Sequence, residues 1–92
     1  MAGRDPRANI AVMGIYLLDH THDAEHCDAS FAAWAGVRSE LRGSTALAGC
    51  ALGRHRVIWH VEAPDERAAL ALLPEFIASR TVVLPVREIL IA

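Results

Sequence analysis

The chain has 92 residues, of which 53% are hydrophobic and 22% are charged, and its formal net charge is −2. This length indicates one small domain, and the large apolar fraction indicates a partner subunit, a ligand cavity or both. The sequence contains no cluster of basic residues, which argues against nucleic-acid binding. No apolar run is long enough to cross a bilayer and no signal peptide is evident. We therefore expect a cytoplasmic protein with no membrane partner.

The chain is expected to begin with a flexible tail and a strand. Residues 1–9 are polar and contain Pro6, which is typical of a loose terminus. We place a single domain at residues 10–92. Its first strand is predicted at residues 10–19 (IAVMGIYLLD), because this run is apolar and rich in residues that favour strands.

A helix is predicted after this strand. It begins at Thr21 or Asp23, since either side chain can cap a helix, and it runs to about Gly36. A connecting loop follows at residues 38–44. The apolar face of the helix is formed by residues at helical spacing, namely Cys27, Phe31 and Trp34.

A hairpin is predicted in the middle of the chain, with strands at residues 45–52 and 55–62. The dipeptide Gly53-Arg54 suits a two-residue turn between them. This turn would place Ala48 opposite Trp59, and it would put Cys50 within the strand, under the helices.

The last third of the chain predicts a second helix and a fourth strand. Asp65 is a good N-cap for the helix, and Pro74 should break or kink it. The strand is predicted at residues 81–91, where Pro85 confines it to the edge of a sheet.

The predicted order β-α-β-β-α-β corresponds to a ferredoxin-like α+β fold, with a four-stranded antiparallel sheet and two helices on one face. The stretches IYLLDHTH (15–22) and RVIWHVEAPDERAALALL (56–73) resemble the dimeric α+β barrel group of ferredoxin-like proteins. They also distantly resemble a small ferredoxin-like family of unknown function with nickel-binding members. The resemblance implies the fold and a tendency to dimerise, and it assigns no functional residue.

The sheet face without helices is predicted to carry a site. We assign Met13, Ile15 and Leu17 to the core, because side chains alternate along a strand. The open face then receives Tyr16, Leu18, His20, Leu47, Ile58, His60 and Glu62, with either Arg87 or Glu88. Such a mixed surface predicts a homodimer with a cavity between two sheets.

We expect this cavity to bind a small, partly apolar molecule against Leu18, Leu47 and Ile58. Within it, His60 would act as an acid or base tuned by Glu62, with Tyr16 and His20 orienting the substrate. By analogy with the dimeric barrel group, the chemistry would be a cofactor-free isomerisation, cyclisation or oxygenation. A non-catalytic interaction module remains an alternative, so the sequence leaves open whether the protein is an enzyme.

A competing hypothesis is a nickel, copper or zinc site built on the run DHTHDAEHC. Its ligands would be His20 and His22, joined by His60 or Glu62 from a neighbouring strand that we expect to run parallel to the first. His26 could join them if the helix start is rearranged. We interpret three other candidate side chains as structural or surface groups, namely Cys27, Cys50 and His55.

Overall fold

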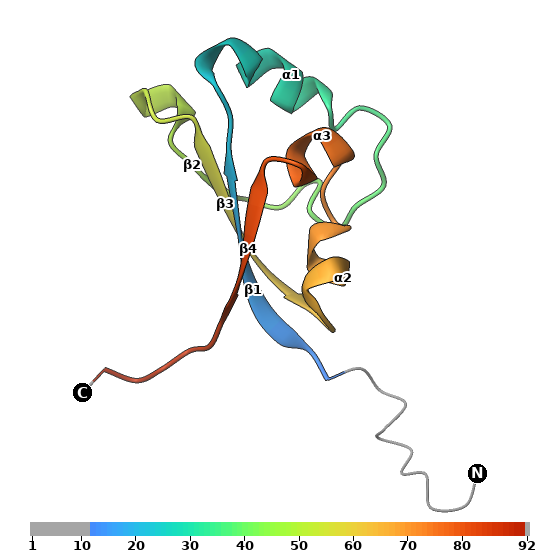
Figure 1. Cartoon of the computed structure of the whole chain (residues 1–92), viewed down its shortest axis with the longest axis vertical. Coiled ribbons are helices and arrows are strands. Elements are labelled where there is room, and N and C mark those ends of the chain that lie inside the picture. Colours follow the sequence, from blue (N-terminus) through green and yellow to red (C-terminus); the bar gives the residue numbers. More distant parts are fainter. Residues whose placement is uncertain (1–11, 92) are drawn as a thin grey trace, which may run out of the picture.

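The computed structural model describes residues 12–91, and the predicted tail at residues 1–9 lies outside this range, as do residues 10 and 11 of the predicted first strand (Figure 1). The protein has an α+β architecture with one four-stranded antiparallel sheet. The strands are β1 (Gly14–Thr21), β2 (Leu47–Ala48), β3 (Arg56–Ala63) and β4 (Thr81–Val86). They lie in the order β2-β3-β1-β4. Pro85 therefore belongs to an edge strand, as predicted; this position suits proline because it has no N–H group to donate to a second neighbouring strand.

Five short helical segments connect the strands, and the three α-helices lie on one side of the sheet (Figure 1). The predicted cap of the second helix is confirmed, since Asp65 Oδ1 accepts a hydrogen bond from the backbone N–H of Ala68 at 2.7 Å. Pro74 divides this helix in two, as predicted. Within residues 12–91, no helix is long and apolar enough to span a membrane. The segments are η2 (Ala24–His26), α1 (Cys27–Ala32), η3 (Cys50–Leu52), α2 (Glu66–Leu70) and α3 (Glu75–Ala78).

The first helix is much shorter than predicted. A turn of 3-10 helix precedes it, and α1 already ends at Ala32 rather than at Gly36. Asp23 precedes the turn, but its side chain caps no backbone N–H group. Phe31, which we expected on the buried face, is 66% exposed, while Trp34 packs against the core. The exposed Phe31 side chain shows that the helical spacing alone did not identify the packed face.

The predicted hairpin is replaced by a wider connection. Ala48 pairs with Val57 rather than with Trp59, and β2 contains only two residues. The backbone of Gly49 lies so close to Arg54 that an added Cβ would come within 2.7 Å of the Arg54 carbonyl oxygen. The chain closes there into a 3-10 turn that starts at Cys50. The register shift of two residues leaves each paired side chain on its predicted face. The 3-10 turn, however, removes Cys50 from the strand.

The two faces of β1 are the reverse of those predicted. Leu18 pairs with Trp59 and is fully buried, so Tyr16, Leu18 and His20 lie under the helices. The open face instead carries Ile15, Leu17 and Asp19. An unbroken apolar run from Ile15 to Leu18 has no period of two, so the pattern could not determine the face. The core around Leu18 consists of Trp59, Val61, Ala63, Ala69, Leu73 and Ile77.

The assignment of faces predicts different costs for two adjacent leucines. We expect Leu18→Ala to lower the free energy of unfolding by about 2–5 kcal/mol, because it leaves a cavity in the core. Leu17→Ala should cost clearly less, since Leu17 is on the open face. Urea unfolding at low protein concentration measures both, and this condition matters because a partner on the open face would also bury Leu17. Equal costs, or a larger cost at Leu17, would contradict the observed register.

Candidate metal centre

Four side chains of the types that bind transition metals meet where β1 ends and β3 begins. His22 follows the last residue of β1, and His55 precedes the first residue of β3. Because the two strands are antiparallel, these residues are neighbours, and the His22 backbone N–H donates to the His55 carbonyl oxygen at 3.1 Å. Cys27 begins α1 and Cys50 begins η3. The cluster thus joins two segments that are far apart in the sequence.

The four donor atoms form a compact group. One atom from each of His22, Cys27, Cys50 and His55 lies within 4.8 Å of all the others. Cys27 Sγ lies 3.7 Å from His55 Nδ1, and Cys50 Sγ lies 3.7 Å from His22 Nε2. In a tetrahedral zinc site, ordinary Zn–S and Zn–N bond lengths place sulfur and nitrogen about 3.6 Å apart. Two of the ligand pairs therefore already have the required separation.

The local backbone explains how each half of the cluster is presented. In the first half, the turn at Ala24–His26 brings Cys27 back toward His22. In the second half, the 3-10 turn starts at Cys50 and is followed by Gly53, which has a φ of 84° that favours glycine. Each half therefore contains one histidine and one cysteine five positions apart, in mirrored order.

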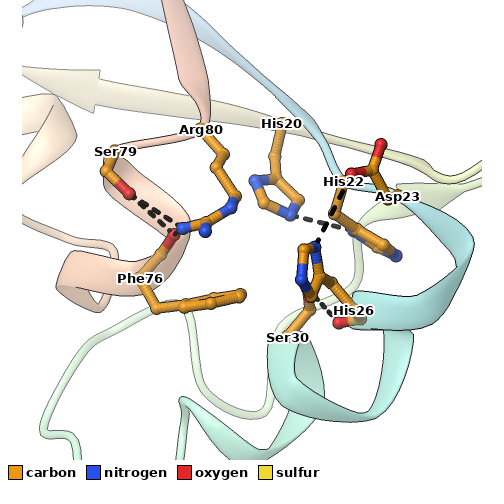
Figure 2. Close-up of polar contacts among 8 residues, drawn as sticks. All are labelled: His20, His22, Asp23, His26, Ser30, Phe76, Ser79 and Arg80. Carbon is orange, nitrogen blue, oxygen red and sulfur yellow. Dashed lines mark hydrogen bonds and ion pairs between the residues drawn. The ribbon is translucent and has the colours of Figure 1, made fainter.

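His20 orients one of the candidate ligands (Figure 2). The His20 Nδ1–H group donates to the Ile77 carbonyl oxygen at 3.2 Å, since a carbonyl can only accept. His20 Nε2 is then an acceptor, and His22 Nδ1–H donates to it at 3.0 Å. This tautomer, assigned from the hydrogen-bond chain, leaves the lone pair of His22 Nε2 facing Cys50. Metal-binding histidines commonly donate their second nitrogen in this way.

The electrostatics favour uncharged side chains in the absence of a metal. Burial lowers the pKa of His20 and of His22, so both imidazoles are neutral at pH 7. Partial burial, followed by the effect of the neighbouring Cys50, raises the pKa of the Cys27 thiol. Neutral imidazole is the form that binds metals, whereas a thiol must lose its proton first. Metal binding here should therefore release protons and strengthen as the pH rises.

The structure does not bring together the metal ligands that the sequence predicted. β1 and β3 run antiparallel, not parallel, and His60 pairs with Leu17, on the face opposite to His20. His20 is a fully buried partner of His22 rather than a member of the compact group. His26 instead lies beside the exposed side chain of Asp23, with 3.9 Å between His26 Nδ1 and Asp23 Oδ2. His55, expected at the surface, is partly buried.

The residues predicted to line a small-molecule cavity are also divided between two faces. His60 and Glu62 are exposed on the open face, whereas Tyr16, Leu18 and His20 lie under the helices. Arg87 and Glu88 follow the end of β4, and both are exposed. A hollow of about 340 Å³ does exist on the open face. It is lined by Leu17, Thr45, Ala46, Leu47, Ile58 and His60.

The chain has no significant match among family models, curated proteins or solved structures. The candidate site therefore rests on its own geometry. A signal for it was present in the sequence as the paired spacings H-x4-C at His22 and Cys27 and C-x4-H at Cys50 and His55. Cysteine is also a small apolar residue that is usually buried, so the sequence alone favoured a structural role for both cysteines.

The lowered histidine pKa values predict a pH dependence for the metal-free protein. The unfolded chain binds protons at His20 and His22 below about pH 6.5, whereas the folded chain resists protonation until lower pH. The free energy of unfolding should therefore fall as the pH decreases through this range. We expect the fall to be smaller in His20→Gln than in the wild-type protein. Urea unfolding with a chelator at several pH values between about 7.5 and 5.5 measures these slopes. An undiminished slope in His20→Gln would contradict the assignment.

Proposed function

We propose that the protein binds one zinc ion per chain through His22, Cys27, Cys50 and His55. The observation that supports this most strongly is the convergence of four donor atoms within 4.8 Å. Both cysteines are partly buried free thiols, so both are able to act as ligands. His20 adds the outer hydrogen bond that holds His22 in the required tautomer.

Zinc fits this donor set better than Cu(II) or Ni(II) does. Two thiolates and two imidazoles around a tetrahedral position are typical of zinc, whereas Cu(II) and Ni(II) prefer planar or tetragonal sites rich in nitrogen and oxygen. Four protein ligands leave no open position for water or substrate, which is typical of a structural rather than a hydrolytic site. The ion would connect the β1–α1 junction to the loop before β3, so its binding free energy would stabilise the fold.

We also propose that the domain is ferredoxin-like. The strand order β2-β3-β1-β4 supports this assignment, as do the two helix-containing connections, one from β1 to β2 and one from β3 to β4. Both connections place their α-helices on the same side of the sheet (Figure 1). This arrangement leaves the other face of the sheet uncovered within residues 12–91.

A homodimer that buries this open face is a second proposal. Leu47, Val82 and Leu84 are between 51% and 76% exposed, and they share the face with Leu17 and Ile58. An apolar surface of this kind favours a partner. A second copy would also enclose the 340 Å³ hollow beside His60. That hollow is where a small, partly apolar molecule would bind in the dimer, in contact with Leu17 rather than with Leu18.

The zinc proposal predicts one tightly bound zinc ion per chain in untagged protein. Replacement of any one ligand by Cys27→Ser, Cys50→Ser, His22→Ala or His55→Ala should lower the affinity by orders of magnitude, because the remaining three donors no longer saturate the ion. Elemental analysis and competition with a chelator measure this. In addition, Co²⁺ should produce a thiolate charge-transfer band that either cysteine variant weakens.

Two histidines outside the site provide matched controls for this experiment. His26→Ala and His60→Ala each remove an imidazole without touching the four donors, so they should retain full zinc affinity. Well under one equivalent of zinc in the wild-type protein would refute the proposed site. Equal losses of affinity in the control variants would also count against it.

His20 is predicted to act as a positioning residue. We expect His20→Ala to weaken zinc binding by roughly 10–100-fold, since outer partners of metal ligands have effects of this size. His20→Gln should recover part of the loss, because its amide can still accept from His22. Isothermal titration of each folded variant measures the affinity. If His20→Ala binds zinc as tightly as the wild type, the hydrogen bond to His22 has no role in binding.

The dimer proposal predicts that a charge on the open face separates the subunits. Leu47→Asp should shift the molar mass from dimer toward monomer, because the face would then bury an unpaired carboxylate. The control is Leu52→Asp, which alters an exposed leucine in η3 rather than on the sheet. Light scattering at micromolar concentration gives the mass, and a wild-type protein that is already monomeric would exclude the dimer.

A further inference from the structure

The outer edge of β3 is largely unpaired. β2 contacts β3 only at Val57 and Ile58, so the stretch 59–63 has no neighbouring strand on that side within residues 12–91. The direction of the free peptide groups follows from the ladder. Arg56 accepts from Gly49 on the outer side, and alternate residues of an antiparallel strand point the same way. His60 and Glu62 therefore direct their N–H and C=O groups outward.

A hollow of about 390 Å³ lies along this free edge. It opens where the chain before β2 diverges from β3, so that the loop 40–45 forms its far wall. Trp59, Val61 and Leu41 give it an apolar side, while Glu40 and Glu62 give it an acidic one. An unpaired edge beside an apolar hollow is a site to which an additional strand can bind, and proteins normally protect such edges.

The end of the chain has the properties of such a strand. Residues 87–91 follow β4 without forming any helix or strand of their own. Ile89, Leu90 and Ile91 are 73%, 94% and 84% exposed. We call residues 87–91 the C-terminal arm. Its five extended residues span about 17 Å, which equals the length of the five-residue free edge.

The arm of the same chain does not lie against this edge. β4 is at the opposite side of the sheet, with β1 and β3 between it and the free edge. Figure 1 shows the arm leaving the domain on the side away from the end of β3 and from α2. The outer edge of β4 is a poorer template, because Pro85 has no N–H group to donate. The arm and the free edge of β3 are therefore complementary, but within one chain they lie at opposite edges of the sheet.

We propose that the C-terminal arm of each protomer pairs with residues 59–63 of β3 in a second copy of the chain. Alternate arm side chains would enter the apolar part of the hollow beside Trp59 and Leu41. Arg87 would bring a positive charge toward the acidic side formed by Glu40 and Glu62. Because the exchange is reciprocal, it closes a two-fold dimer rather than an open chain. The inference rests on the proposed homodimer and specifies a contact within it, and it is independent of the zinc site.

The test combines molar mass with hydrogen exchange measured by NMR. In the wild-type dimer, the amide groups of His60 and Glu62 should exchange slowly, although no strand within residues 12–91 of their own chain covers them. Leu90→Asp should weaken the dimer on the order of tenfold or more, as expected for an anchor worth at least about 1.4 kcal/mol. The same variant should accelerate exchange at His60 and Glu62 while the amides of β1 remain protected.

Two further variants make the result decisive. A chain that ends at Val86 should behave like Leu90→Asp, and it retains every strand, so its fold can be verified independently. Leu52→Asp, an equally exposed leucine elsewhere, should keep both the dimer and the slow exchange. Fast exchange at His60 and Glu62 in a wild-type dimer would overturn the arm contact and leave the dimer standing. A monomeric wild-type protein would overturn both proposals.

Discussion

The antiparallel pairing of β1 with β3 places the end of one strand beside the start of the other. This pairing makes His22 and His55 neighbours, and it brings the segments that carry Cys27 and Cys50 to the same end of the sheet. The pairing also determines which side of β1 is buried, because Leu18 must share a face with Trp59. The candidate metal centre, the core and the open face are all consequences of this one ladder.

A buried imidazole is costly unless its polar atoms have partners, so the position of His20 requires an explanation. His20 is fully buried, and both of its ring nitrogens are bonded, one to the Ile77 carbonyl and one to His22. A leucine there would fill the core without needing hydrogen bonds. The hydrogen bonds of His20 instead connect α3, through the Ile77 carbonyl, to the candidate ligand His22. This arrangement supports the view that His20 serves the site rather than the core.

The short secondary structure elements give a metal ion a physical role. The α-helices contain six, five and four residues, and β2 contains two. Helices of this length are not stable alone in water, so their conformation depends on tertiary contacts. A small domain with few such contacts gains most from a cross-link. Zinc at the proposed site would restrain the connection from β1 to β3, which contains the longest irregular stretch of the described chain.

The sequence by itself determined the features that depend on local chemistry. The order of strands and helices, the cap at Asp65, the break at Pro74 and the edge position of Pro85 all follow from what single residues can or cannot do. The choice of His22 as a possible metal ligand also came from the sequence, because the imidazole type indicates the chemistry. Only the tertiary structure decided the faces of β1, since an apolar run without alternation is compatible with both. It also decided the ligand set, because Cys27 and His55, like His22 and Cys50, are 28 residues apart and meet only when β1 pairs with β3.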